Sequence, residues 1–341
     1  MFERIKEIIT PEDVKKILPL SENGKRVKSE RDSLLKKIIS GLDDRKVMIV
    51  GPCSADNEVA VLDYMSRLAR ISEQVKDKLF IVPRIYTNKP RTRGDGYKGI
   101  FHNPNPCKGT DIQEGIMAMR HMHIKSIEET GLSAADEMLY PENYDYLEDL
   151  LTYVAVGARS SENQQHRLVA SGVDVPVGVK NPMFGSMSVL LNSIYAAQIP
   201  NEFKYGKYQV KTAGNAYAHA VLRGGVDSFG NNIPNYHYED VIKFYDMYKQ
   251  QNLKNPAVII DVNHSNSNKN PFEQIRIVKE IISNMNSCDK FKELVKGFMV
   301  ESYIEDGNQS PDGSVYGKSI TDGCLGWDKT RKLIFDVAEH L

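Results

Sequence analysis

The sequence predicts an α/β protein folded as a (β/α)8 TIM barrel, and three observations support this prediction. Short apolar runs rich in β-branched residues recur eight times along the 341 residues. Segments with helical period separate most of these runs, and alternating strands and helices build a parallel sheet. Chemically reactive residues follow the runs at their carboxyl ends, where barrels of this kind carry their functional loops. Eight such units favour a closed barrel over an open sheet.

The predicted elements follow one another in regular order. The strands are short runs bounded by Gly, Pro or polar residues, at 47–50, 80–85, 132–137, 153–157, 175–180, 219–222, 257–261 and 297–301. The helices are the periodic segments 58–74, 111–130, 143–150, 161–171, 187–197, 239–252, 273–287 and 327–341. The sixth unit is irregular, because an inserted β-hairpin is predicted near strand six at 203–211 and a Gly/Asn/Pro-rich loop at 226–236.

The domain organisation follows from these elements. Residues 1–40 form an N-terminal extension of two helices that are interrupted between Pro19 and Gly24, and residues 41–341 form the barrel. A barrel of this class needs about 250 residues, so the extension and long loops account for the remainder. Such an extension usually covers the barrel floor or mediates subunit contact.

Composition excludes several classes of protein. Lys and Arg number 44 and Asp and Glu 45, so the net charge of -1 gives no general attraction to nucleic acid or to an anionic membrane. The start, MFERIKEIIT, lacks the apolar core of a secretory signal, and no apolar run reaches the roughly 18–20 residues of a membrane span. Four scattered cysteines do not suggest a disulfide framework. We therefore expect a cytoplasmic protein.

One set of residues at the strand ends consists of metal-ligand types. Its members are Cys53, His264, Glu301 and Asp322. A mixed sulfur, nitrogen and oxygen set would accept one divalent metal ion, namely Mn, Fe, Co, Zn or Cu. Each member alone has a simpler explanation, since a lone cysteine usually packs as a small apolar group and a lone histidine usually forms ordinary hydrogen bonds. The metal hypothesis therefore requires that all four meet at one barrel mouth.

A second set is cationic. Its members are Arg84, Lys89, Arg91, Arg159, Lys180 and Arg223. Gathered at one mouth, these cations would repel one another unless they bind anions, and phosphate and carboxylate groups are the ligands that Arg binds best. The alternative for each is a solvated surface charge. That alternative suits Lys180 poorly, because it ends the apolar run VPVGVK and a charge there needs a partner.

The chain resembles the type I 3-deoxy-D-arabino-heptulosonate-7-phosphate (DAHP) synthases across nearly the whole barrel. The matching pieces are GPCS, PRIYTNKPRT, GARSSENQQHR, PVGVKN, LRGG, NHSNSNK, MVESYIEDGNQS and YGKSITDGCLGW. The resemblance implies an enzyme that condenses phosphoenolpyruvate with erythrose 4-phosphate and water to give DAHP and phosphate, the first step of the shikimate pathway. It also implies one divalent metal ion and a homodimer or homotetramer.

The resemblance implies residue roles, matched position by position. The metal ligands would be Cys53, His264, Glu301 and Asp322. The phosphoenolpyruvate site would consist of Arg84, Lys89, Glu137, Gly157, Ala158, Arg159, Lys180 and Arg223. The erythrose 4-phosphate site would consist of Lys89, Pro90, Arg91 and Thr92. Lys89 is the expected proton donor to the developing alkoxide, with His264 or metal-bound water as rivals.

Two other functions stay open at this point. The KDO8P synthases share the barrel and the chemistry but use arabinose 5-phosphate, and they carry a stretch similar to KANRSS where this chain has KPRT. A catalytically inactive barrel acting as a binding subunit is the other alternative, although no expected ligand is missing. Feedback inhibition is a separate question. Asp174 stands where phenylalanine-sensitive relatives carry a small polar residue, so the enzyme is expected to be unregulated or to answer another effector.

Overall fold

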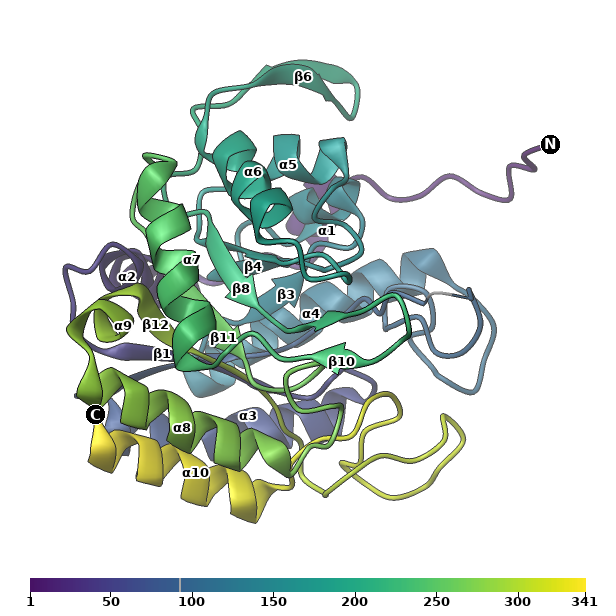
Figure 1. Cartoon of the computed structure of the whole chain (residues 1–341). Coiled ribbons are helices and arrows are strands. Elements are labelled where there is room, and N and C mark those ends of the chain that lie inside the picture. Colours follow the sequence, from purple (N-terminus) through teal and green to yellow (C-terminus); the bar gives the residue numbers. More distant parts are fainter. Residues whose placement is uncertain (92) are drawn as a thin grey trace.

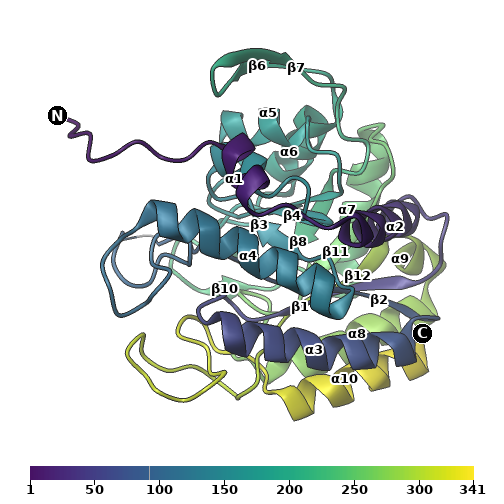
Figure 2. The same ribbon diagram turned by 180° about the vertical axis from the view of Figure 1, so that it is seen from behind.

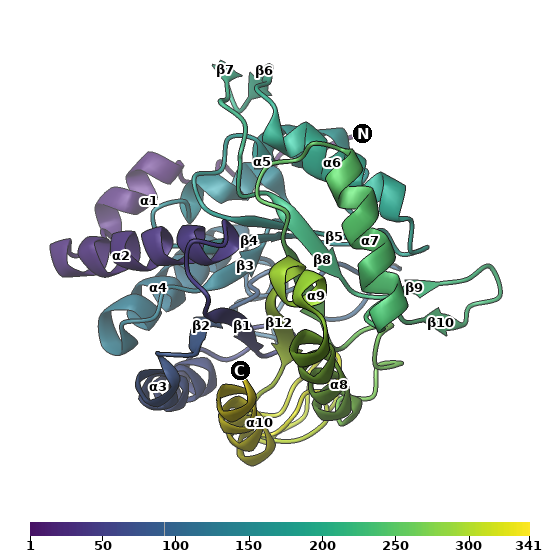
Figure 3. The same cartoon turned by 60° about the vertical axis from the view of Figure 1, so that its left-hand side comes forward.

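Eight parallel strands form the centre of the molecule. The computed structural model describes residues 1–91 and 93–341. Within them the strands lie in the order β2-β1-β12-β11-β8-β5-β4-β3. A further bridge between Arg84 and Ala135 joins the two ends of this order, so the sheet closes on itself. Helices surround it (Figure 3), and the prediction of a (β/α)8 barrel is confirmed.

Each predicted strand overlaps an observed one. The barrel strands are β1 Lys46–Gly51, β2 Leu79–Pro83, β3 Ala135–Glu137, β4 Tyr153–Val156, β5 Val177–Lys180, β8 His219–Leu222, β11 Val258–Asp261 and β12 Val295–Glu301. The helices outside them are α3 Glu58–Val75, α4 Ile112–Thr130, α5 Gln164–Ala170, α6 Met187–Gln198, α7 Tyr238–Gln250, α8 Glu273–Ser287, α9 Asp289–Leu294 and α10 Trp327–His340.

Two predicted helical features need correction. The helix expected at 143–150 is instead a 3-10 turn, η1 Pro141–Tyr146, which ends where Leu147 leaves helical backbone angles at φ -128°. The short helix α9 was not predicted. It is only 6 residues long, so it contains too few residues for a helical period to be recognised.

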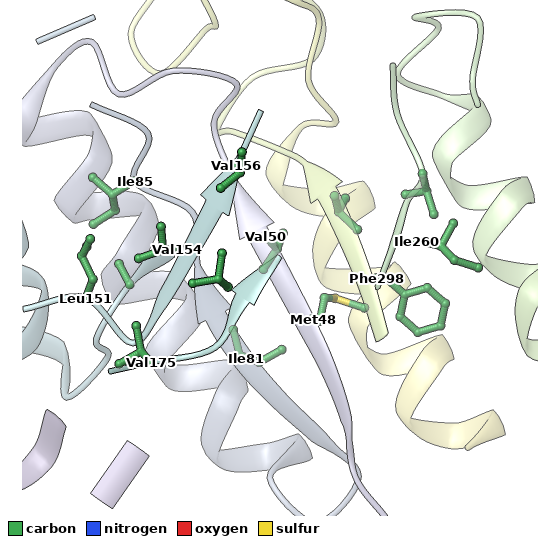
Figure 4. Close-up of a cluster of buried hydrophobic side chains, with 14 of the residues drawn as sticks. Met48, Val50, Ile81, Ile85, Leu151, Val154, Val156, Val175, Ile260 and Phe298 are labelled. Carbon is green, nitrogen blue, oxygen red and sulfur yellow. The ribbon is translucent and has the colours of Figure 1, made fainter. Parts of the chain in front are cut away.

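The core consists of two apolar layers that the strands separate. Along β1, Met48 and Val50 pack outward among residues of the surrounding helices. Val47 and Ile49 belong to the second cluster, inside the barrel. Figure 4 shows the outer layer, where Met48 and Val50 lie with side chains of other strands such as Phe298. This alternation is expected of strands whose two faces are both buried.

The N-terminal extension covers the barrel floor. It contains the two predicted helices, α1 Pro11–Ile17 and α2 Glu22–Ile39, and the side chains of Thr10 and Ser21 cap their first turns. Leu35 and Ile38 of α2 belong to the cluster inside the barrel, so this helix closes the end at which the strands begin. The N-terminal end of the chain extends away from the body (Figures 1 and 2), whereas Ile9, just before α1, packs against the core.

Two insertions project from the barrel. The hairpin predicted near strand six is present as β6 Glu202–Tyr205 paired with β7 Tyr208–Lys211, and it stands clear of the body (Figure 2). The segment 226–236 was predicted as a loop, but the short antiparallel pair β9 Gly225–Val226 and β10 Asn232–Ile233 forms there, with β9 beginning one residue earlier. No helix in the described part of the chain has the length and apolar character of a bilayer span.

Candidate active site

A cavity of about 160 Å³ opens at the carboxyl ends of the strands. Figure 1 shows three long segments on this side of the molecule: the one that leads into α4, the β9–β10 hairpin and the one that leads into α10. Most residues singled out in the sequence line the cavity. They are Arg84, Lys89, Pro90, Arg91, Glu137, Gly157, Ala158, Arg159, Lys180, Arg223, His264 and Asp322.

Three singled-out residues do not appear in this lining. Cys53 and Glu301 are fully buried. Both nevertheless reach lining residues, since Cys53 Sγ lies 3.7 Å from Asp322 Oδ2 and Glu301 Oε1 lies 2.7 Å from Arg84 Nη2. Thr92 lies outside the described residues. The cavity is also lined by Met183 and Lys269, which were not among the predicted site residues.

The four residues of metal-ligand type meet at the inner end of the cavity. One ligand atom each from Cys53, Glu301 and Asp322 lies within 4.8 Å of the other two. His264 approaches the same group, with Nε2 at 3.7 Å from Glu301 Oε1. A thiol, an imidazole and two carboxylates at such separations are a suitable donor set for a first-row divalent metal. The residues therefore fit the ion that the resemblance implies.

Cations of the protein lie among these acidic groups. The Lys89 ammonium lies 2.6 Å from Cys53 Sγ and 3.5 Å from Asp322 Oδ2. Burial lowers the pKa of Lys89, but the carboxylates of Asp322 and Glu301 and the neighbouring Cys53 sulfur outweigh burial and raise it above its usual range. Lys89 is therefore protonated at neutral pH. Burial and the nearby Glu301 raise the pKa of the Cys53 thiol to about 11.

One nitrogen of the Arg84 guanidinium has no hydrogen-bond acceptor among the described residues. Its guanidinium is fully buried, stacks 3.8 Å above the Tyr86 ring, and donates from Nη2 to Glu301 Oε1. Its Nε donates to the carbonyl of Pro52 at 3.1 Å. The remaining nitrogen, Nη1, is buried and has no acceptor among residues 1–91 and 93–341. Buried donors almost always have a partner, so this one points to an anion that binds in the cavity.

A further part of the cavity wall carries Lys180 and Arg223, which lie near Asp261. Lys180 Nζ and His264 Nδ1 lie 3.4 and 2.9 Å from Asp261 Oδ2. Burial raises the pKa of Asp261, but the neighbouring His264 and Lys180 outweigh burial and hold that pKa far below its usual range. Arg223 donates to Ser265 Oγ at 3.2 Å, and its pKa is lowered by burial first, with Arg159 acting in the same direction. The wall therefore has a surplus of positive charge.

Backbone geometry brings these side chains together. Gly157 follows β4, and a Cβ there would lie 2.1 Å from Glu137 Oε1, so the glycine leaves room for that carboxylate at the cavity wall. His264 has φ +46°, a left-handed conformation that only a few per cent of non-glycine residues adopt. Such conformations concentrate at functional sites. This turn directs His264 toward both Asp261 and Glu301.

Sequence reasoning missed two charged residues of this site. Asp261 ends the seventh strand, as Glu301 ends the eighth, and this shared placement was a usable signal. Lys269 lies five residues after His264, and only its place in the same loop could have indicated it.

Comparison with known proteins assigns the chain to a family. The model of the DAHP synthetase I family matches residues 18–334. The chain belongs to the DAHP synthetase I family. It is 36% identical over 346 aligned residues to the Phe-sensitive phospho-2-dehydro-3-deoxyheptonate aldolase of Escherichia coli, an alignment that covers 99% of this chain and 95% of that one.

Other members of the DAHP synthetase I family agree with this assignment. The Tyr-sensitive phospho-2-dehydro-3-deoxyheptonate aldolase of Salmonella typhimurium is 33% identical, with 98% of this chain and 93% of that one covered. The solved structure of the phospho-2-dehydro-3-deoxyheptonate aldolase from Francisella tularensis superposes with a TM-score of 0.93 at 30% identity, covering 100% of this chain and 98% of that one. The resemblance read from the sequence is thereby confirmed.

Proposed function

We propose that this member of the DAHP synthetase I family condenses phosphoenolpyruvate with erythrose 4-phosphate and water to give DAHP and inorganic phosphate, the first step of the shikimate pathway. The observation that carries the proposal is the cavity, which gathers six Arg and Lys residues of the two predicted substrate sites around a metal-ligand set. Both substrates are phosphate esters, so a mouth with surplus positive charge suits them.

Phosphoenolpyruvate would bind at the inner end. Its phosphate and carboxylate can together accept donors from the buried cations Arg84, Lys180 and Arg223, and from Arg159. The unpartnered Nη1 of Arg84 supports this placement, since Arg holds such anions through paired, charge-assisted hydrogen bonds. The backbone of Gly157 and Ala158 forms the adjoining wall, and Glu137 lies beside it.

Erythrose 4-phosphate would enter with its aldehyde first. Its phosphate would stay at the outer side, on the KPRT segment formed by Lys89, Pro90, Arg91 and Thr92. Arg91 Nε is buried without an acceptor within the described ranges, which supports an anion there. Lys89 belongs to this segment and its ammonium lies 2.6 Å from Cys53 Sγ, so it would touch both substrates.

The reaction would proceed by carbon–carbon bond formation followed by loss of phosphate. C3 of the enol phosphate attacks the aldehyde carbon, water adds at C2, and phosphate leaves by cleavage of its C–O bond. Lys89 would give a proton to the developing alkoxide, which its place beside Cys53 and Asp322 supports. Holding two anionic substrates in one orientation would supply much of the acceleration, roughly 7–11 kcal/mol in well-oriented systems.

We also propose that the enzyme depends on one divalent metal ion. Cys53, His264, Glu301 and Asp322 would hold it, and their mixed donor set suits Mn, Fe, Co, Zn or Cu. When bound there, such an ion would supply Lewis-acid polarisation of the aldehyde oxygen. Cys53, His264 and Lys89 are accordingly the residues to which we assign catalysis.

The test is phosphate release from phosphoenolpyruvate, measured with erythrose 4-phosphate and separately with arabinose 5-phosphate, each with and without EDTA. We expect release with the four-carbon sugar that EDTA stops and Mn²⁺ restores. Release with arabinose 5-phosphate instead would indicate a KDO8P-type synthase. No release with either sugar after Mn²⁺ addition would favour a non-catalytic barrel. A homodimer or homotetramer remains a prediction, which light scattering would check.

A further inference from the structure

Lys269 is a cation of the active-site mouth to which neither predicted substrate site assigns a role. It lines the same cavity as Arg84 and Arg91, but its side chain is 61% exposed, whereas that of Arg84 is 1% exposed. The cavity therefore has an inner group of buried cations and an outer group that solvent reaches. Lys269 belongs to the outer group, where a second substrate would arrive.

The fold does not account for the lysine side chain. Lys269 has φ +58° and follows Asn268 at φ +53°, so both adopt the left-handed region in which Gly and Asn are favoured. Its backbone N–H donates to the carbonyl of His264 at 2.8 Å, which closes the turn that orients His264. Any residue except proline can donate this hydrogen bond. The turn thus sets where residue 269 lies, while its own stability would be served as well or better by asparagine.

The nearest charge does not explain Lys269 either. Its ammonium lies 4.0 Å from Asp322 Oδ1, at the outer limit of an ion pair, and the two side chains are 61% and 33% exposed. Exposed pairs of this kind contribute little to stability. Asp322 directs its other oxygen, Oδ2, to Lys89 at 3.5 Å. In the part of the chain that the structure describes, Lys269 Nζ makes no hydrogen bond, so its three N–H groups are available to a ligand.

We propose that Lys269 binds the phosphate of the incoming aldose phosphate together with Arg91, which lines the same cavity. This inference rests on the proposed function. A phosphate monoester carries nearly two negative charges at neutral pH, whereas the KPRT segment offers Arg91 as its outer cation, because Lys89 is engaged with Cys53 and Asp322. Lys269 supplies the second positive charge, and its exposure leaves it in reach of a substrate that binds after phosphoenolpyruvate.

The experiment compares steady-state kinetics of the wild type with Lys269→Asn, Lys269→Arg and the control Lys332→Gln. Lys269→Asn removes the cation but suits the left-handed backbone, and Lys332 is an exposed lysine on α10, outside the barrel. We expect Lys269→Asn to raise KM for erythrose 4-phosphate about tenfold, while kcat, KM for phosphoenolpyruvate and Tm stay near wild type. Lys269→Arg should recover most of the loss, and Lys332→Gln should change nothing.

Three outcomes would overturn the inference. An unchanged KM for erythrose 4-phosphate in Lys269→Asn would show that the lysine does not bind this substrate. A parallel rise in both KM values with weaker metal binding would show that Lys269 acts by positioning Asp322. Failure of Lys269→Arg to recover affinity would show that the charge is not what matters. A wild type that turns over neither aldose would contradict the proposed function instead, so the two failures are distinguishable.

Discussion

Cations at the floor and at the mouth of this barrel differ in whether the fold supplies acceptors for all their N–H groups. At the floor, the buried Lys46 donates from Nζ to the carbonyls of Lys292 and Val295 at 2.8 and 2.9 Å, and the half-buried Arg31 donates to the carbonyl of Ile81 at 2.6 Å. These cations find acceptors in the backbone itself. At the mouth, Arg84 Nη1 and Arg91 Nε are buried and have no acceptor in residues 1–91 and 93–341.

This difference separates stability from function. A buried cation whose N–H groups all find acceptors in the protein stabilises the fold. Its removal costs stability, because the acceptors are left buried without a hydrogen bond. A buried cation with an unused donor carries a desolvation cost that only a ligand offsets. Changes at the mouth should therefore reduce activity and spare stability, whereas changes at the floor should do the reverse. The four predictions below test this contrast, from the largest expected effect to the smallest.

The largest effect is expected at the metal-ligand set. Cys53→Ala should lower kcat by about a thousandfold or more, because Lewis-acid polarisation supplies several kcal/mol and each 1.36 kcal/mol is a factor of ten. Bound metal per chain, measured by elemental analysis, should fall in parallel, while phosphoenolpyruvate binding measured by calorimetry should remain. Cys324→Ala is the matched control, since Cys324 is equally buried but lies outside this group. Full activity in metal-free Cys53→Ala would contradict the metal assignment.

The next effect compares one arginine from each end. Arg223→Met should lower kcat/KM for phosphoenolpyruvate a hundredfold or more, because it removes charge-assisted hydrogen bonds worth roughly 1.5–3 kcal/mol each. Its unfolding free energy should stay level or rise, since burial and Arg159 already disfavour the charge of Arg223. Arg31→Met at the floor should instead cost roughly 1–3 kcal/mol of stability, because the carbonyl of Ile81 loses the hydrogen bond that Arg31 donates to it.

These two variants can break the comparison directly. Urea unfolding and steady-state kinetics on the same preparations give both quantities. If Arg223→Met loses as much stability as Arg31→Met, the mouth cation is structural after all. If Arg31→Met loses activity per folded molecule, the floor is coupled to catalysis.

The third prediction concerns acid stability at the floor. His219 begins β8, is fully buried, and has a pKa lowered to about 4 by burial. Tyr153 Oη donates to its Nε2 at 3.0 Å, while its Nδ1 lies 2.8 Å from the carbonyl of Tyr217, so both ring nitrogens suit the neutral imidazole. Between pH 6.5 and 4 the unfolded chain binds a proton here that the native state does not. His219 thus favours folding fully above pH 6.5, and about 3 kcal/mol is lost as the pH falls to 4.

The measurement is the unfolding free energy of wild type and His219→Gln at several pH values in this range. Carboxylates titrate in the same window in both proteins, so the difference between the two curves isolates the histidine. We expect the variant to be less stable at pH 7 but to lose less on acidification. Parallel curves would mean that the native state protonates His219 as readily as the unfolded chain does, which would contradict its place in the satisfied floor.

The strands and the residues that end them could be predicted from the sequence, whereas residues whose roles depend on loop geometry could not. The eight strands were predictable because apolar runs of four to six residues mark a sheet buried on both faces, and Arg84, Lys180 and Glu301 were found because they end such runs. Asp261 also ends such a run, but it was missed because it pairs with the neighbouring Lys180 and His264 and has no obvious role in binding a ligand. Lys269 was missed because its role depends on a turn at φ +58°, which residue identities do not encode. The pair β9–β10 was missed because Asp227 organises it through hydrogen bonds to Phe229 and Asn231, not through apolar periodicity.

The smallest effects are expected from two glycines, Gly157 just after β4 and Gly178 within the neighbouring strand β5. A Cβ on Gly178 would lie 1.8 Å from Tyr153 Oη and 2.7 Å from a Val221 methyl inside the packed barrel, so Gly178→Ala should cost roughly 1–3 kcal/mol of stability. A Cβ on Gly157 would meet Glu137 Oε1, the end of a side chain that can move. Gly157→Ala should therefore change the unfolding free energy by less than about 1 kcal/mol. It should still weaken phosphoenolpyruvate binding severalfold, because the displaced carboxylate would enter the cavity. Equal losses of stability in the two variants would mean that the mouth is packed as rigidly as the interior, and the contrast between the two ends would then rest on charge alone.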